Sequence, residues 1–122
     1  MLSGIPDARL RVLVVWEPVL RTDFGGPLTQ VLGLLRDGRV AQYWDPERVV
    51  SAEIVRAVNE SPSHYGFDEP FPSDFVVWDV VSVFSKSASW HEALPVPTYF
   101  GGPVMNVVEE TRAALSEANA GN

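Results

Sequence analysis

The hydrophobic residues of this chain are concentrated in four short runs. Residues 10–20 are almost continuously apolar and rich in β-branched valine, which is typical of a strand buried on both faces. Residues 39–44 form a second, shorter run, and residues 75–84 show the strongest strand pattern in the chain. A fourth run covers residues 96–100. We therefore predict four strands.

Three other segments repeat apolar residues at the spacing of an amphipathic helix. The first follows Pro27, which suits the first turn of a helix, and the second follows Asp45, which we expect to cap it ahead of Pro46. The third begins after Pro103 and ends before a frayed tail at residues 117–122. The stripe of the first helix consists of Leu28, Val31, Leu32 and Leu35.

A segment rich in serine, proline and aromatic residues separates the second helix from the third strand. We predict a long loop over residues 59–74 whose aromatic rings need a place to be buried. The resulting order is β-α-β-α-β-β-α, in which the first two strands should be parallel. The length fits a single α/β domain, residues 1–122, with an ordered core at about residues 10–116.

This order of elements resembles the thioredoxin-like core, in which a β-α-β half is followed by a long connection, a β-hairpin and a closing helix. The resemblance covers residues 10–115 and implies a single mixed sheet flanked by helices. It also implies a cis-proline just before the hairpin, where Pro72 matches and Pro70 is the alternative. The redox dithiol of the family would fall within residues 21–27, but the chain contains no cysteine. Thiol–disulfide exchange is therefore excluded.

Composition and charge exclude several classes of partner. The formal net charge of -7 and the scattered basic residues argue against nucleic acids and anionic membrane surfaces, which require a basic footprint. No apolar stretch reaches the roughly 20 residues that span a bilayer, and the N-terminus lacks the pattern of a signal peptide. We expect a cytoplasmic protein that needs no cofactor.

Three of the apolar segments contain a tryptophan followed directly by an acidic residue, at residues 16–17, 44–45 and 78–79. Ligands of open α/β sheets bind beyond the carboxyl ends of parallel strands, so such pairs mark an edge where a ligand could bind. Three carboxylates there could hold Mg²⁺. However, an antiparallel hairpin would carry Asp79 away from that edge, and Asp45 is explained as a helix cap. We therefore predict no metal site.

The interpretation that we prefer is a non-redox binding domain for an unidentified protein or small molecule. Its site would be a groove between the start of the first helix, residues 22–27, and the loop at residues 70–74. The aromatic residues of the long loop, together with Trp90, could add an apolar patch for a partner. The residues expected to bind the ligand are Trp16, Thr22, Asp23, Gly25, Gly26, Trp44 and Pro72.

Two alternatives stay open. The chain could be an enzyme for a small molecule, with Asp23, Asp45 and His64 as the catalytic acids and bases, although a lone loop histidine more often faces solvent. It could also be a structural homodimer whose interface buries the loop aromatics and Trp90.

Overall fold

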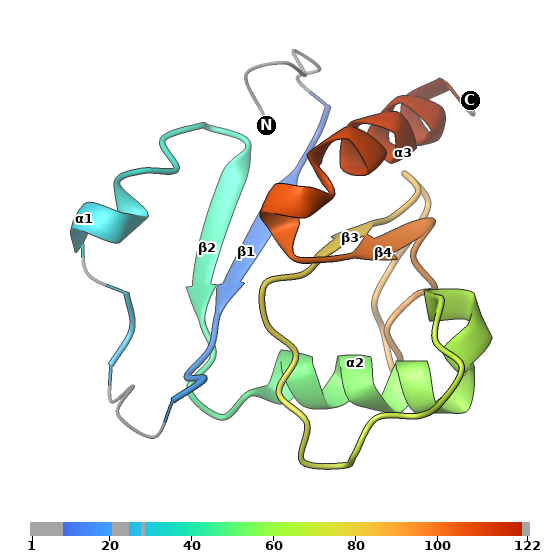
Figure 1. Ribbon diagram of the computed structural model, residues 1–122. Helices are drawn as coiled ribbons and strands as arrows, with labels where there is room; N and C mark the ends of the chain where they lie inside the picture. Colours follow the sequence, from blue (N-terminus) through green and yellow to red (C-terminus); the bar gives the residue numbers. More distant parts are fainter. Residues whose placement is uncertain (1–8, 21–24, 28, 121–122) are drawn as a thin grey trace. The chain divides into compact units, whose positions relative to one another are not determined.

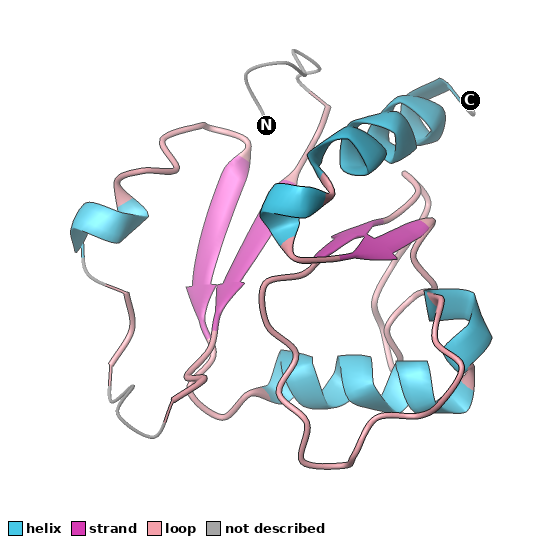
Figure 2. Cartoon of the chain, viewed as in Figure 1, coloured by secondary structure: helices cyan, strands magenta, loops and turns pink. Residues whose placement is uncertain are grey.

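The computed structural model describes residues 9–20, 25–27 and 29–120 (Figure 1). The chain is mixed α/β, as predicted, and Figure 2 shows its helices and strands. It divides into two compact units, the first ending at Val50 and the second beginning at Ser51. Each unit is described by itself.

A parallel pair of strands forms the centre of the first unit. β1 (Val12–Trp16) lies beside β2 (Val40–Trp44), in a register that places Trp16 opposite Trp44. Both strands coincide with predicted apolar runs, and their parallel direction confirms the prediction. The β-branched residues of these runs fit the pleated backbone of a strand.

The first helix is much shorter than its apolar stripe predicts. α1 (Thr29–Leu32) is a single turn that is followed directly by Gly33. Beyond it, the amide of Leu34 donates to the carbonyl of Val31, a bond between residues three apart, as in a 3-10 turn. Glycine lowers helix propensity by about 1 kcal/mol relative to alanine. The helix predicted to continue to Leu35 therefore ends at Leu32, and Leu35 is 37% exposed.

The second helix begins later than the sequence predicts. α2 (Val49–Glu60) starts after Arg48, whose φ of 56° lies in the left-handed region and is incompatible with a helical turn. Asp45 still serves the helix, because its carboxylate accepts a hydrogen bond from the amide of Val50 at 2.9 Å. In the second unit the helix is followed by the 3-10 turn η2 (Pro62–Tyr65).

The second unit contains an antiparallel pair of strands. β3 (Val81–Val83) pairs with β4 (Tyr99–Gly101), and this antiparallel pairing was predicted. The prediction of a strand from residue 75 is wrong, because the backbone at residues 75–80 is irregular. There the amide of Val77 donates to a side chain, and Asp79 has a φ of 55°. The described residues form two small sheets, in place of the single mixed sheet that we predicted.

The C-terminal segment of the second unit is helical. The 3-10 turn η3 (Val104–Asn106) leads into α3 (Val108–Ala120), which extends through most of the predicted tail and packs against β3. The cis peptide bond found in the described part of the chain joins Gly102 to Pro103, whereas the resemblance placed one at Pro72. No helix in this part of the chain is long and apolar enough to cross a membrane.

The core of the second unit lies between α2 and the aromatic residues of the long loop. Val58 is completely buried, and Tyr65 is 6% exposed. Phe67 and Phe71 are half-buried, so the expectation that the loop rings are buried is met fully only for Tyr65. Trp78, which lies in the run predicted to form the third strand, is 64% exposed, and Trp90 is 47% exposed. Packed against Val58 and Tyr65 are Ile54, Phe67, Phe71, Leu94 and Phe100.

Candidate functional site

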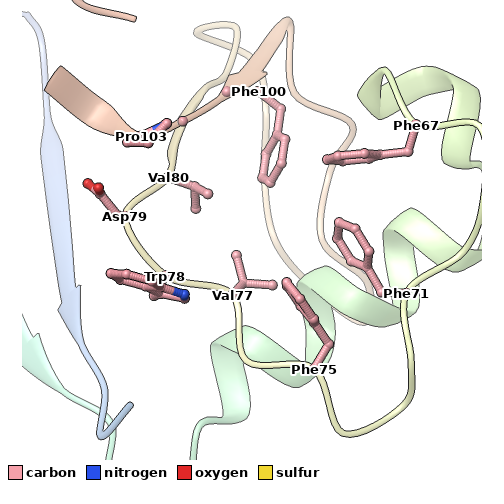
Figure 3. A pocket seen from close by; sticks show the side chains of 11 residues that line it. Phe67, Phe71, Phe75, Val77, Trp78, Asp79, Val80, Phe100 and Pro103 are labelled. Carbon is pink, nitrogen blue, oxygen red and sulfur yellow. The ribbon is translucent and has the colours of Figure 1, made fainter. Parts of the chain in front are cut away.

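The second unit contains an apolar hollow with a volume of about 400 Å³ (Figure 3). This volume lies within the usual range of ligand pockets, roughly 300–1,000 Å³. Its wall comes from the long loop, from the irregular segment before β3, and from the end of β4 with the residues that follow it. The lining residues are Phe67, Phe71, Phe75, Val77, Trp78, Asp79, Val80, Phe100, Gly101, Gly102 and Pro103.

Four phenylalanines form one side of this hollow. The rings of Phe71 and Phe75 are stacked with centroids 4.6 Å apart, and Phe67 meets the ring of Phe71 edge-on at 4.7 Å. Phe67 also contacts Phe100, which in turn meets the buried ring of Tyr65. Stacked and edge-on contacts are the favoured arrangements of aromatic pairs. The exposed rings of the hollow are thus fixed to the core through a continuous series of rings.

Two polar side chains of α2 hold the backbone of this wall. The hydroxyl of Ser51 accepts a hydrogen bond from the amide of Val77 at 2.6 Å and donates one to its carbonyl. The side-chain amide of Asn59 accepts from the amide of Phe71 at 2.7 Å and donates to its carbonyl at 3.0 Å. Backbone groups that lack a partner strand are satisfied in this way. The wall is therefore held in place without a ligand.

The backbone at Gly102 lies very close to the segment before β3. A Cβ atom at Gly102 would lie 2.5 Å from the carbonyl oxygen of Asp79 and 3.2 Å from the side chain of Val80. Only glycine allows two backbone segments to approach this closely. Gly102 thereby joins the two segments that supply the wall.

Asp79 is the only charged residue along the wall, among the residues that the structure describes. Its φ of 55° is a conformation that aspartate tolerates better than most residues, and its carboxylate accepts a hydrogen bond from the amide of Val104 at 3.2 Å. In Figure 3 its side chain and that of Trp78 lie on the side of the wall opposite the four phenylalanines. The hollow thus combines an aromatic side with an exposed anionic edge.

A smaller hollow of about 270 Å³ lies in the first unit. It brings together three of the residues that we predicted to bind a ligand, Trp16, Gly26 and Trp44. The indole nitrogen of Trp16 donates to the side chain of Gln42 at 3.0 Å, and Gln42 donates to the carbonyl of Leu32 at 3.0 Å. These polar groups are occupied with one another, so the hollow offers mainly the faces of its rings.

The carboxylate of Asp45 is committed to the start of α2. Burial alone would raise the pKa of Asp45, but hydrogen bonds from the backbone amides of Val50, Val49 and Arg48, together with one from Glu17, outweigh it and lower the pKa. A general base that works near neutral pH needs a raised carboxylate pKa. Asp45 therefore acts as a cap. In the described ranges, no three His, Cys, Asp or Glu residues are grouped so that they could hold a metal ion.

The remaining predicted site residues belong to different units or lie outside the described residues. Thr22 and Asp23 lie outside the described residues. Gly25 is exposed in the first unit, whereas His64, in η2, and Pro72 are exposed in the second. The groove between the first helix and Pro72, and the catalytic group of Asp23, Asp45 and His64, stay predictions.

Sequence reasoning recognised part of the hollow and missed the rest. Phe67 and Phe71 were expected in an apolar patch, but residues 75–80 were assigned to a buried strand. The signal that marks this segment is the aspartate inside an otherwise apolar run, because Asp79 is a residue type that interrupts strands. The Gly-Gly-Pro sequence at residues 101–103 was expected to precede the last helix, and it was not predicted to line an apolar hollow.

The chain matches no model of a known protein family, no curated protein and no solved structure.

Proposed function

We propose that this chain is a binding domain and that the hollow of its second unit holds a bulky apolar side chain of a partner polypeptide. The observation that carries the proposal is the series of stacked rings from Phe75 to Phe100, which is exposed on one side and anchored in the core on the other.

The openness of the site favours a polypeptide over an isolated small molecule. Small-molecule pockets usually enclose 70–90% of the ligand surface. Here Trp78 is 64% exposed and Phe75 is 42% exposed, so the wall is broad and shallow. Exposed aromatic residues around a hollow are typical of the central contacts of protein interfaces. A side chain presented by a larger partner would cover these rings as well as fill the hollow.

The composition of the wall favours binding over catalysis. Apart from Asp79, its lining residues carry no side chain that titrates or acts as a nucleophile. Acid–base or nucleophilic catalysis requires at least a second such group within hydrogen-bonding reach. The hollow therefore supplies contact area and one charge.

The thioredoxin-like order of elements belongs to the same proposal. The parallel pair β1–β2 and the antiparallel pair β3–β4 support it, since that core contains a β-α-β half and a hairpin. The proposed binding domain performs no redox chemistry, because the chain has no cysteine.

A titration with a minimal neutral probe tests the proposal. We expect N-acetyl-phenylalaninamide to shift the amide resonances of Phe71, Val77 and Gly102 in a ¹⁵N-labelled sample, and N-acetyl-alaninamide to leave them unchanged. Trp78→Ala should abolish the shifts. Trp90→Ala is the matched control, because it removes an exposed tryptophan outside the hollow. The absence of shifts in the wild-type chain would refute the proposal.

A second copy of the chain is the competing occupant of this surface. The second unit also exposes Trp90 by 47%, Val96 by 62% and Met105 by 88%, and such residues are often covered in homodimers. Sedimentation analysis over a hundredfold range of concentration distinguishes the two. A monomer throughout supports a separate partner, and a dimer that Trp90→Ser or Trp78→Ala dissociates supports the structural homodimer.

A further inference from the structure

We infer that the partner segment carries a basic residue, with arginine the best fit, next to the apolar side chain that enters the hollow. This inference rests on the proposed function, because it identifies the class of ligand for the same site. It depends on the charge of the segment that builds the wall and on the geometry of Asp79.

The segment that supplies most of the wall contains acidic residues but no lysine or arginine. No lysine or arginine occurs from residue 57 to residue 85, so the nearest basic residues in the sequence are Arg56 and Lys86. Arg56 is paired with Glu53 and Glu60. The surroundings of the hollow therefore favour a cation over an anion. The acidic residues of this segment are Glu60, Asp68, Glu69, Asp74 and Asp79.

Asp79 differs from the other four acids because it lies on the wall itself. Its backbone is in a left-handed conformation and lies very close to Gly102, and the amide of Val104 donates a hydrogen bond to one carboxylate oxygen, Oδ1. The carboxylate is exposed and lies beside Trp78 in the chain. A carboxylate whose position is fixed loses little conformational freedom when it binds a cation.

Arginine fits the pairing of Asp79 and Trp78 better than lysine. A guanidinium group can bind a carboxylate and stack on an aromatic face, whereas an ammonium group is a compact, strongly hydrated charge. A partner with an aromatic residue next to arginine would place its ring against the phenylalanines and its charge at the anionic edge. These two sides of the wall lie opposite each other in Figure 3.

Two dipeptides that differ in one charge test the inference. The dissociation constants of N-acetyl-Phe-Arg-amide and N-acetyl-Phe-Gln-amide are measured by NMR titration at low and at high ionic strength. We expect the arginine peptide to bind about threefold to fivefold more tightly at low salt, the range of an exposed ion pair. The difference should shrink at high salt, because exposed charges are screened.

Asp79→Asn isolates the charge. Asparagine tolerates the left-handed backbone and keeps the oxygen that binds Val104, so the wall should stay intact. We expect this variant to bind both peptides with the weaker affinity. Asp74→Asn is the matched control, because Asp74 is an exposed acid of the same segment that does not line the hollow. It should keep the preference for arginine.

The outcomes separate this inference from the proposed function. If the two peptides bind the wild-type chain equally, the basic partner is refuted while the apolar site stands. The basic partner is also refuted if Asp74→Asn removes the preference for the arginine peptide as fully as Asp79→Asn does. The preference would then reflect the net charge of the chain and not the position of Asp79. If neither peptide binds, both proposals fail.

Discussion

The hydroxyl of Ser51 is hydrogen-bonded to both backbone groups of Val77, at 2.6 Å to its amide nitrogen and 3.4 Å to its carbonyl oxygen. Ser51 is 2% exposed and Val77 is 9% exposed, so water does not compete for these groups. A residue of α2 thus holds the segment that forms the centre of the candidate site. The bond links the stability of the unit to the shape of the hollow.

Ser51→Ala should destabilise the chain by about 1–3 kcal/mol, the cost of leaving a buried amide without a partner. Urea denaturation measures this free energy of unfolding. Ser73→Ala, at an exposed serine, should change it by less than about 0.5 kcal/mol. Equal stabilities for the two variants would show that Ser51 does not hold the wall.

Asn59 should control the local opening of the loop at Phe71. Asn59→Ala removes both hydrogen bonds to Phe71, and Asn59→Asp keeps the acceptor for its amide but removes the donor to its carbonyl. In hydrogen exchange, the Phe71 amide should exchange fastest in the alanine variant, at an intermediate rate in the aspartate variant and slowest in the wild type. An unchanged exchange rate in Asn59→Ala would show that Asn59 does not hold the loop at Phe71.

Tyr65→Phe should stabilise the chain, by about 1 kcal/mol. The Tyr65 hydroxyl is buried and has no hydrogen-bond partner among the described residues, and an unsatisfied buried hydroxyl costs free energy. Tyr65→Ala removes the buried ring as well and should lower the free energy of unfolding by about 3–5 kcal/mol. Thermal unfolding compares the two variants. A loss of more than about 1 kcal/mol in Tyr65→Phe would mean that the hydroxyl is satisfied.

The same residue predicts a pH dependence. Burial is the main cause that raises the pKa of Tyr65, so the unfolded chain releases this proton more readily than the folded chain. The folded state should therefore lose stability as the pH rises above about 10, the ordinary tyrosine pKa. Tyr65→Phe should reduce this loss. If the free energy of unfolding falls equally with rising pH in the variant and in the wild type, the predicted role of Tyr65 is refuted.

Asp45 should stabilise the chain at neutral pH and lose this effect in acid. Burial raises its pKa, but the amide hydrogen bonds at the start of α2 outweigh burial, so its pKa is lowered on folding. The stabilisation is present above the ordinary aspartate pKa, about 3.9, and is lost as the pH falls through the lowered value. Asp45→Ala should cost about 0.5–2 kcal/mol at pH 7 and much less at pH 2, as measured by urea denaturation. A cost that does not depend on pH would contradict the role of the charged cap.

The parts of the fold that could be predicted depend on local pattern. β1 and β2 follow directly from two apolar runs with a helical segment between them, an arrangement that favours parallel pairing. α2 was predicted because its apolar residues repeat at the helical spacing. Its start was missed because the left-handed conformation of Arg48 is not encoded in that spacing.

The segment at residues 75–80 could not be predicted in the same way. Its apolar residues satisfy the pattern of a strand, but its backbone amide at Val77 bonds to Ser51, which lies far away in the sequence. The approach of Gly102 to Asp79 is likewise a contact between distant segments. The candidate site depends on this segment and on its approach to Gly102, which explains why the sequence showed aromatic residues of the site but not its shape.

The most direct test of the account is a search for contacts between N-acetyl-phenylalaninamide and the valine residues that line the hollow. Val77 and Val80 both line it. With ¹³C-labelled valine methyl groups, the phenyl protons of N-acetyl-phenylalaninamide should give intermolecular NOEs to Val77 and Val80, and Trp78→Ala should remove them. NOEs only to valines outside the hollow, such as Val96 or Val14, would show that the ligand binds elsewhere and would contradict the account.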